Sequence, residues 1–535
     1  MAKKLNIERT FYHLGAWGRY QTWIFTLGNF AWFFIALQML SIAFTADKPP
    51  FTCSENKAQL NSDANETWND KCVSPLDNLT TCAANNSTVL RFNREFGQTI
   101  VSEWSLVCSR TYLTGLATSA LFVGFFLGGA VVPGLADRWG RRKVFLANAV
   151  LLVVVSFASA FVPNLATFIV LRVFNGITCA GTGVVGWVYS CEVMVTRNRS
   201  YGTLCQGIFW MIGVCLVGIL AIFWRDWRQL TVACAIPCVA ILLYYWFLPE
   251  SLQWYVATNQ TDAAYAWIDR AKQVNKVNFD LADCHEDDDE TSDLASNGNT
   301  TTPNDKTVTR NVFHIFKSAP LVVQTLINVY IWFTSCIIFY ALSLYSTRLA
   351  GNRYVNYLLT GVVELPAYLL LPYTMNWLGR RWSLMIYYMM VCLSLVALVL
   401  LPKREDGSSY VVASTALWLV GKFSIASSFM GIWLFGAEIF PTTVRSAGVG
   451  LCNVAARFGG MVAPFSQLLA SVHPTLAPVT FAVLSFVASM LVLLLPETAH
   501  VPLAHDLHDV DPGPCLRVCF QRQQRKHSST RPVAL

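Results

Sequence analysis

Charged residues are scarce in this chain. Only 13% of its 535 residues are Asp, Glu, Lys or Arg, whereas 54% are hydrophobic. Soluble domains carry about 25% charged residues, so a soluble globular protein is excluded and lipid is the expected solvent for most of the surface. The chain also lacks the alternation of polar and apolar residues that membrane β-strands show over about ten residues, which excludes a barrel.

Signals for nucleotide chemistry and for a cleaved leader are missing as well. No glycine-rich loop ends in Lys-Ser or Lys-Thr, so we expect no coupling to nucleotide hydrolysis. We also expect no cofactor and no enzymatic activity. Lys3, Lys4 and Arg9 precede no short apolar region with a cleavage site, so we expect the first apolar segment to be retained. The net charge of +7 indicates contact with the inner leaflet of a membrane rather than with nucleic acid.

Long apolar segments dominate the chain instead. Each has about 20 residues, enough to cross a hydrocarbon core of about 30 Å as a helix. They cover residues 20–44, 113–134, 144–163, 166–189, 201–223, 229–248, 321–345, 354–375, 383–401, 411–436, 446–470 and 476–495. We therefore predict an all-α membrane protein with about twelve transmembrane helices in two six-helix bundles, residues 20–248 and 319–495. Cytoplasmic segments are predicted at residues 1–19, 249–318 and 496–535.

A polar loop, residues 45–112, separates the first two apolar segments. It carries four glycosylation sequons and four cysteines: Asn65, Asn78, Asn85, Asn86, Cys53, Cys72, Cys82 and Cys108. Because glycans and disulfides form outside the cytosol, we predict an extracellular loop, two cytoplasmic termini and a location in the plasma membrane. The four cysteines permit three pairings, which the sequence does not distinguish. Chance sequons with free thiols are the alternative.

Charged motifs recur at matching positions of the two halves. In the first motif, Gly134 to Lys143, the charged residues include Asp137, Arg138, Arg141 and Arg142, and a shorter copy contains Arg380 and Arg381. In the second motif a glutamate precedes an arginine by seven residues, as in Glu192 with Arg199 and Glu438 with Arg445. A third pairs Pro-Glu-Ser at 249–251 with Pro-Glu-Thr at 496–498.

This repetition predicts a transporter built from two homologous halves. We interpret the carboxylates and guanidinium groups of the motifs as gating ion pairs, which form in one conformational state and break in another. Arginines that only fix the membrane topology are the alternative.

The motifs resemble those of the major facilitator superfamily, and the chain is similar to its organic cation, carnitine and organic anion transporters. The resemblance covers nearly the whole chain. Besides the cysteine-bearing loop, it rests on residues 103–108, 226–228, 364–368 and 437–442. It implies the major facilitator fold and alternating access, in which residues 1–250 and 320–500 rock about a central site.

Ionisable residues inside apolar segments mark the predicted transport path. A charge at the bilayer centre costs several kcal/mol unless it faces a cavity or a partner. Arg457 lies roughly 16 Å deep at about 1.5 Å per residue, and Glu364 and Lys422 come out at similar depth. For Arg457, an ion pair with a carboxylate that only locks two helices together is the alternative. The resemblance implies that aromatic residues line the same cavity, namely Trp210, Trp332, Phe339, Tyr340, Phe429 and Trp433, although packing would explain them too.

The predicted site favours a carboxylate-bearing substrate. An arginine beside aromatic faces suits a carboxylate together with a quaternary ammonium or an aromatic body. The resemblance implies that the anion and carnitine branches carry arginine at position 457, whereas Tyr368 stands where anion exchangers often have lysine. We predict transport of organic cations and zwitterions of the carnitine type. Organic anion exchange is one alternative, and a non-transporting receptor or adaptor is another.

Departures from the family pattern bear on coupling. Sodium-coupled carnitine carriers of the family show an asparagine near the position of Ile35, and Asn376 replaces an acidic residue. We therefore expect facilitated or exchange transport by a monomeric unit.

Smaller predictions concern the predicted cytoplasmic segments. The loop 249–318 is expected to begin with a helix, residues 262–272, and its acidic run beside His285 favours a solvated segment over a metal site. In the tail, Cys515 and Cys519 beside a basic run suit palmitoylation. The final residues, Val533 to Leu535, resemble a PDZ-domain ligand, although a random apolar tail would look the same.

Overall fold

The fold is almost entirely helical. A computed structural model describes residues 5–54, 89–195, 200–280, 315, 318–402, 410–441, 443–473, 475–499 and 511–513. Within these ranges the strands form one antiparallel hairpin, in which β1 (Phe51–Ser54) pairs with β2 (Val89–Phe92) and Phe51 lies opposite Phe92. The predicted all-α class is thus confirmed for the described spans, with a small hairpin added in the first polar loop.

The N-terminal half contains the helices from α1 to α12. Their bounds are α1 Ile7–His13, α2 Arg19–Leu40, α3 Ile42–Thr45, α4 Ile100–Glu103, α5 Thr111–Trp139, α6 Arg141–Ala158, α7 Leu165–Glu192, α8 Ser200–Phe223, α9 Trp227–Cys238, α10 Tyr244–Phe247, α11 Leu252–Ala257 and α12 Thr261–Asn275. The predicted helix at 262–272 is therefore present as α12.

The C-terminal half contains the helices from α14 to α21. Their bounds are α14 Ala319–Tyr345, α15 Arg353–Val362, α16 Glu364–Leu378, α17 Arg380–Leu400, α18 Val411–Ile439, α19 Arg445–Val462, α20 Ser466–Val472 and α21 Leu476–Val492. Short 3₁₀ turns extend three of the long helices, namely η5 Val239–Leu243 after α9, η8 Ser346–Arg348 after α14 and η9 Ala463–Phe465 after α19.

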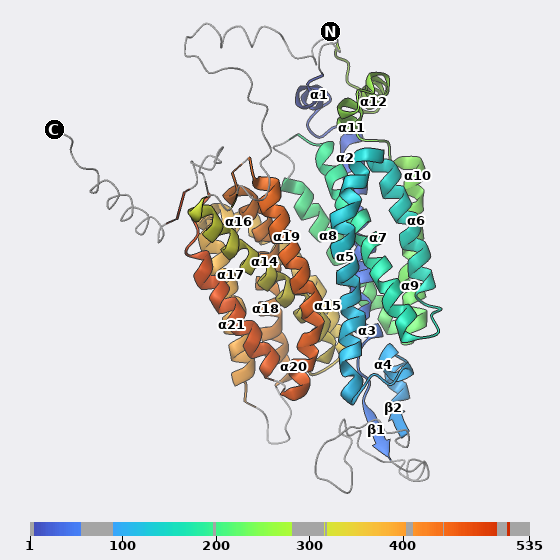
Figure 1. Ribbon diagram of the computed structural model, residues 1–535, viewed down its shortest axis with the longest axis vertical. Coiled ribbons are helices and arrows are strands. Elements are labelled where there is room, and N and C mark those ends of the chain that lie inside the picture. The colour runs from blue at the N-terminus through green and yellow to red at the C-terminus, as the bar shows by residue number, and fades with distance from the viewer. Residues whose placement is uncertain are drawn as a thin grey trace, which may run out of the picture.

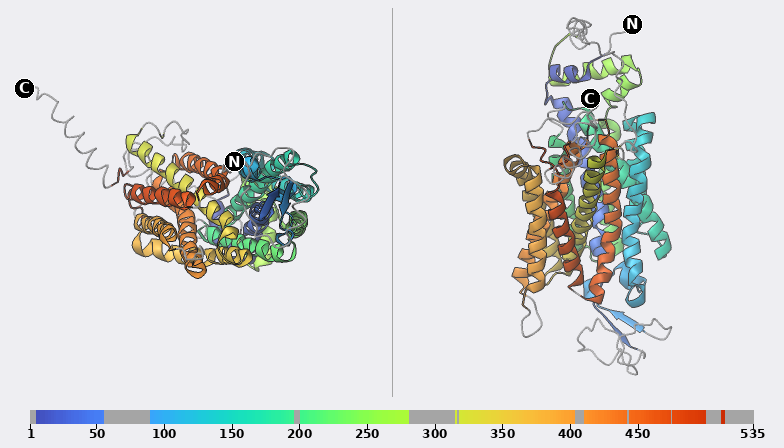
Figure 2. Two further views of the ribbon diagram at one scale, coloured as in Figure 1. Left: turned by 90° about the horizontal axis from the view of Figure 1, so that it is seen from below. Right: turned by 60° about the vertical axis from the view of Figure 1, so that its left-hand side comes forward.

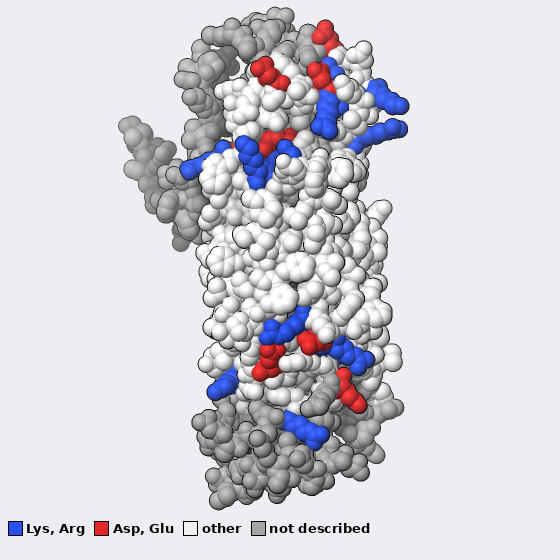
Figure 3. Space-filling view, turned by 90° about the vertical axis from the view of Figure 1, so that its right-hand side faces the viewer, with Lys and Arg blue, Asp and Glu red and all other residues white. Residues whose placement is uncertain are grey.

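The two halves stand side by side as separate helical bundles (Figures 1 and 2). The hairpin lies at one end of the molecule, called the hairpin end below, and α1, α11 and α12 lie at the other. We call this second end the motif end, because α5 and α6 meet there at the first repeated motif. Figure 3 shows charged side chains gathered toward the two ends of one face, with an uncharged belt between them. Such a belt is the surface expected of a protein that lipid surrounds.

Every predicted apolar segment coincides with a helical stretch, but not all of these are long membrane-crossing helices. Within the described residues, nine helices are long and apolar enough to span a membrane. The other three stretches are α6, α19 and α21. Helix α6 opens with three basic residues, α19 contains two arginines, and α21 has only 17 residues. Length and apolarity alone thus support nine of the twelve predicted spans.

In the C-terminal half, two predicted segments are interrupted by breaks in the helix. The segment 354–375 breaks between α15 and α16 at Val363, just before Pro366, and the segment 446–470 breaks at η9, which contains Pro464. Proline lacks a backbone N–H and clashes with the preceding turn, so an uninterrupted helix is disfavoured at both places.

Close helix packing builds each bundle. In the N-terminal half, a Cβ atom on Gly124 of α5 would lie 1.9 Å from the carbonyl oxygen of Val173 in α7, and one on Gly176 would lie 2.0 Å from that of Leu121. Only glycine permits this approach, which is a common device for packing helices in lipid. The halves touch each other through α5 with α19 and α8 with α15 and α16.

Candidate functional site

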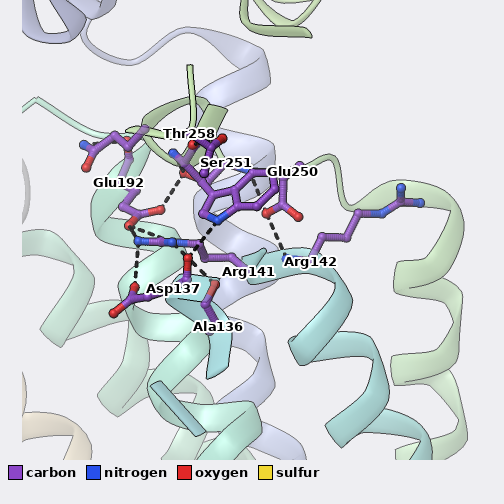
Figure 4. Close-up of polar contacts among 10 residues, drawn as sticks. Ala136, Asp137, Arg141, Arg142, Glu192, Glu250, Ser251 and Thr258 are labelled. Atoms are coloured by element: carbon purple, nitrogen blue, oxygen red, sulfur yellow. Dashed lines mark hydrogen bonds and ion pairs between the residues drawn. The ribbon is translucent and has the colours of Figure 1, made fainter. Parts of the chain in front are cut away.

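The first repeated motif forms a compact ion-pair network at the motif end of the N-terminal half (Figure 4). Arg141 lies at the first position of α6, and its Nη2 atom is 2.9 Å from Oδ1 of Asp137 and 3.1 Å from Oε1 of Glu192 at the end of α7. The hydroxyl of Ser251 donates to the other oxygen of Glu192 over 2.5 Å. The first, second and third motifs therefore meet in a single network.

A glutamate of the third motif fixes the turn between α5 and α6. Glu250 accepts hydrogen bonds from the backbone N–H groups of Arg142, over 3.0 Å, and Ser251, over 3.1 Å. Gly140 adopts a φ of +102°, and a Cβ there would lie 2.5 Å from the carboxylate of Glu250. Burial raises the pKa of the Glu250 carboxyl, and the backbone hydrogen bonds offset part of that rise.

The C-terminal half repeats the arrangement with different residues. Arg380 binds both oxygens of Glu438, at 3.2 and 3.3 Å, and Thr498 donates to Glu438 in the role of Ser251. Glu497 accepts from the backbone N–H groups of Arg380 and Arg381, at 2.8 and 3.1 Å. Asn376 replaces the carboxylate of Asp137 and reaches Arg380 only at 3.4 Å.

The remaining predicted gating residues lie around these networks. Arg138 is exposed, and Arg199 falls outside the described residues. The side chain of Arg142 points away from Glu192 (Figure 4) and donates to the carbonyl oxygen of Tyr245 in α10 over 2.7 Å. Arg445 donates to the carbonyl oxygen of Phe440.

All the described ion pairs of the motifs lie within one half. The network of Arg141 joins α5, α6 and α7, and that of Arg380 joins α17 with α18. In this conformation the described motif pairs therefore brace each bundle, and a role in latching the two halves together stays a prediction.

Glu364 and Lys422 form a buried pair inside the C-terminal half. Lys422 Nζ lies 2.8 Å from Glu364 Oε1, and both side chains are at most 1% exposed. Tyr368 donates to the other oxygen of Glu364, and Lys422 donates to Ser343 and lies 3.4 Å from the centre of the Phe339 ring. The two charges neutralise each other, so neither is available to a ligand in this conformation.

Arg457 stands between the halves. Its guanidinium carbon lies 4.2 Å from the centre of the Phe125 ring, which belongs to α5 of the other half. Among the described residues, neither a carboxylate nor a hydrogen-bond acceptor is paired with it. A partly buried arginine over an aromatic face leaves its donors open to an anionic group.

The predicted aromatic residues form close ring pairs and differ in exposure. Phe339 stacks on Phe429 with ring centres 5.1 Å apart, and Trp332 meets Trp433 edge-on at 4.6 Å. Trp332, Phe339, Tyr340 and Trp210 are buried, whereas Phe429 and Trp433 are partly exposed. The two residues of α18 are therefore the more accessible ones, and their contact with a ligand stays a prediction.

Ion pairs at the hairpin end were not predicted from the sequence. The buried carboxylate of Asp47, just after α3, lies 3.5 Å from Nε of Arg348 and 3.9 Å from Nη1 of Arg353. Arg353 also donates to the carbonyl oxygen of Phe96 over 2.7 Å. These contacts cross from the N-terminal half to the C-terminal half.

A second polar cluster ties the first polar loop to the N-terminal bundle. Glu103 lies 2.6 Å from Arg228, which also donates to the carbonyl oxygens of Ala160 and Val162. The Trp227 indole donates to Glu103 over 2.6 Å. Residues that carried the family resemblance, at 103–108 and 226–228, therefore anchor the loop.

Arg172 was also missed. It is 5% exposed within α7 and donates to the carbonyl oxygen of Gln38 over 3.1 Å, while its Nε has no partner among the described residues. Its position inside a predicted apolar segment was the signal that could have revealed it.

Most of the predicted loop chemistry falls outside the described side chains. Cys108 is disulfide-bonded, whereas the side chains of Cys53, Cys72 and Cys82 and the four sequon asparagines lie outside the described residues. The pairing and the glycans stay predictions, as do palmitoylation and the PDZ ligand. His285 is not described either, and the described residues contain no cluster of metal-ligating side chains.

Known transporters match the chain over most of its length. The profile of the family described as "Sugar (and other) transporter" matches residues 32–506. The chain is 30% identical over 527 residues to the organic cation transporter protein of Drosophila melanogaster, with 93% of each chain covered. It is 31% identical to organic cation/carnitine transporter 2 of Mus musculus, covering 82% of this chain and 75% of that one.

Solved structures agree on the fold. The chain superposes with a TM-score of 0.61 on the partially occluded, inward-open xylose transporter XylE from E. coli, at 15% identity, covering 90% of this chain and 98% of that one. Such distant identity establishes only the fold. Sequence and fold agree that the protein is a multi-pass membrane transporter and not an enzyme. The chain belongs to the major facilitator superfamily, in the organic cation transporter family of solute carriers.

Proposed function

We propose that this protein is a plasma-membrane transporter that moves organic cations and zwitterions of the carnitine type by alternating access. The hairpin end is extracellular in this proposal, because the sequons and the disulfide-bonded Cys108 belong to the same polar loop. The motif end and both termini are then cytoplasmic.

The observation that carries the proposal is the guanidinium of Arg457 between the halves, which pairs with no carboxylate in the described part of the chain. Arg457 belongs to α19 and Phe125 to α5, so the site contains a charge from one half and an aromatic face from the other. A substrate carboxylate would pair with Arg457, and its quaternary ammonium would rest on aromatic faces, worth about 0.5 to 2 kcal/mol each. A substrate between two bundles is the arrangement that alternating access requires.

Simple cations fit this site less well than zwitterions. The only carboxylate among the predicted site residues, Glu364, is neutralised by Lys422 at 2.8 Å. A cation without a carboxylate would therefore depend on aromatic faces alone, beside an unpaired arginine.

An organic anion exchanger is the second candidate, and the same charges favour it. With Glu364 neutralised, the charge left unpaired at the site is the positive charge of Arg457. An aromatic carboxylate would satisfy that charge as well as a zwitterion does. The two candidates differ in whether a quaternary ammonium improves transport.

Uptake by cells that express the protein separates these candidates. Labelled carnitine, tetraethylammonium and para-aminohippurate are compared with and without sodium, for the wild type and for Arg457→Ala. We expect sodium-independent carnitine uptake that falls at least tenfold in Arg457→Ala at equal surface expression. Lys143→Ala, which removes an exposed positive charge outside the site, is the matched control.

Other outcomes would overturn the assignment. Preference for para-aminohippurate would identify an anion exchanger. Uptake of none of the three by protein that reaches the surface would favour a different substrate or a receptor or adaptor. Carnitine uptake that survives in Arg457→Ala would remove Arg457 from the site.

A further inference from the structure

A basic pocket lies at the motif end of the N-terminal half, away from the predicted substrate site. Its cavity of about 450 Å³ opens among the start of α2, the start of α6, the end of α10 and the outer face of α12. Three arginines line it, Arg19, Arg142 and Arg270, each from a different helix. No Asp or Glu is among the described residues that form its lining.

The arginines of this pocket have N–H donors that are available to a ligand. Arg19 and Arg270 are exposed, and neither has an ion-pair partner within the described part of the chain. Arg142 donates one hydrogen bond to the carbonyl oxygen of Tyr245, while its buried Nε has no partner among the described residues. Three positive charges converge on one cavity without a described carboxylate, which creates a local attraction for anions.

Aromatic residues place this pocket at the surface of a bilayer. Trp23, Trp246 and Phe247 also line it and are 48%, 69% and 51% exposed, and the rings of Trp23 and Phe247 are 5.9 Å apart. Exposed tryptophans of membrane proteins concentrate at the level of the lipid headgroups. The pocket thus combines exposed aromatic side chains, suited to acyl chains, with three arginines.

We propose that this pocket binds the phosphate group of an anionic lipid headgroup from the cytoplasmic leaflet. The assignment to that leaflet rests on the orientation in the proposed function. Arginine is the residue best suited to phosphate, because its planar fork donates two parallel hydrogen bonds. The cytoplasmic leaflet carries the anionic lipids of the plasma membrane, so ligand and pocket meet at the same depth.

The pocket shares a residue with the motif network. The backbone N–H of Arg142 is held by Glu250, and its neighbour Arg141 binds Glu192. A phosphate that fixes the Arg142 side chain would also steady the turn between α5 and α6. The bound lipid should therefore stabilise the N-terminal bundle.

Lipid binding to the purified full-length protein tests the proposal without any transport assay. Phosphatidylinositol 4-phosphate, phosphatidylserine and phosphatidylcholine are titrated into detergent-solubilised protein while the Tm is followed, and bound lipid is counted by native mass spectrometry. We expect the two anionic lipids, but not phosphatidylcholine, to raise the Tm. The double variant Arg19→Gln/Arg270→Gln should require at least tenfold more lipid, whereas Lys143→Gln, an exposed neighbour outside the pocket, should match the wild type.

Two results would overturn the proposal. Equal lipid binding by the wild type and the double variant would exclude the pocket. A separate titration with inorganic phosphate distinguishes the source of the ligand, since free phosphate that stabilises the protein as well as the lipids do would exclude a lipid site. A lipid response in protein that transports none of the tested substrates would leave this inference standing while the proposed function fails.

Discussion

The two ends of the molecule use ion pairs differently. At the motif end, Arg141 pairs with Glu192 and Arg380 with Glu438, and each pair stays within its own bundle. At the hairpin end, the carboxylate of Asp47 reaches Arg348 and Arg353 across the boundary between bundles. Among the described ion pairs, those that join the two halves thus lie at the hairpin end, whereas the motif pairs at the other end brace each half internally.

Other contacts between the halves also lie toward the hairpin end. The hydroxyl of Ser119, near the hairpin end of α5, donates to the carbonyl oxygen of Met461 over 2.6 Å, and Phe122 meets Tyr340 with ring centres 4.7 Å apart. Farther along α5, Phe125 lies under Arg457. The halves thus contact each other toward the hairpin end, and each bundle is braced separately at the motif end. Given the proposed orientation, this is the arrangement that a transporter closed to the outside requires.

Breaking the brace within a bundle should have the largest effect. Arg141→Ala leaves Glu192 without its cation, and Arg380→Ala does the same to Glu438, both at sites where the partners are at most 17% exposed. Loss of one partner of a largely buried pair costs about 3–5 kcal/mol. We expect a Tm several degrees lower for each purified variant and reduced surface expression. Arg138→Ala, an exposed arginine of the same motif, is the control, and an unchanged Tm for both variants would contradict the role of the brace.

Breaking the pair that crosses the halves should change conformation more than stability. Asp47→Asn leaves Arg348 and Arg353 without the carboxylate with which they form ion pairs at 3.5 and 3.9 Å, and a coupling between two parts of a protein is typically about 1–3 kcal/mol. A loss of that size shifts a two-state equilibrium by roughly 5- to 150-fold toward opening at the hairpin end. The shift is measured as faster labelling of Ser119→Cys by a membrane-impermeant thiol reagent, relative to the parent protein.

A matched variant controls for this effect. Asp226 is another carboxylate at the hairpin end, but it caps α9 within the N-terminal half. Asp226→Asn should leave the labelling of Ser119→Cys unchanged. Equal acceleration by both substitutions would show that Asp47 does not hold the halves together.

The sequence predicts the bundles well because the information is local. An apolar run of about 20 residues specifies a membrane helix by itself, and repeated motifs specify two related halves. The bends at Val363 and η9 can be predicted from the nearby prolines. Contacts that depend on local spacing can likewise be predicted, as for Asp137 and Arg141, which lie four positions apart on a tight turn.

Contacts between residues that lie far apart in the sequence could not be predicted. Asp47 lies just beyond an apolar run, and its partners follow about 300 positions later, so no local pattern marks it. The sequence shows the third motif as a repeat. It does not show that Glu250 and Glu497 accept hydrogen bonds from backbone N–H groups more than 100 residues away. For Lys422 and Glu364 the sequence predicted depth, whereas their mutual neutralisation is a tertiary fact.

The two copies of the motif differ in one charge, and exchanging it should have a small effect. Asp137 is 68% exposed beside Arg141, and Asn376 holds the same place beside Arg380. Exposed ion pairs contribute about 0–1 kcal/mol, so Asn376→Asp should raise the Tm by at most a few degrees and Asp137→Asn should lower it by a similar amount. Both shifts should shrink in high salt. A large, salt-insensitive loss in Asp137→Asn would mean that the copies are not equivalent.

The smallest expected effect is a pH dependence that arises from Glu250. Burial raises the pKa of its carboxyl above the ordinary value of 4.5, although hydrogen bonds from backbone N–H groups lower it in part. The folded protein therefore binds this proton more readily than the unfolded chain does, so this contribution to stability falls as pH rises from about that value through the raised one. Lowering the pH from 7 toward 5 should raise the Tm of the wild type relative to Glu250→Gln, which cannot take up the proton. A difference in Tm that stays constant with pH, or that moves in the opposite direction, would show that the N–H groups of the α5–α6 turn outweigh burial at this carboxylate.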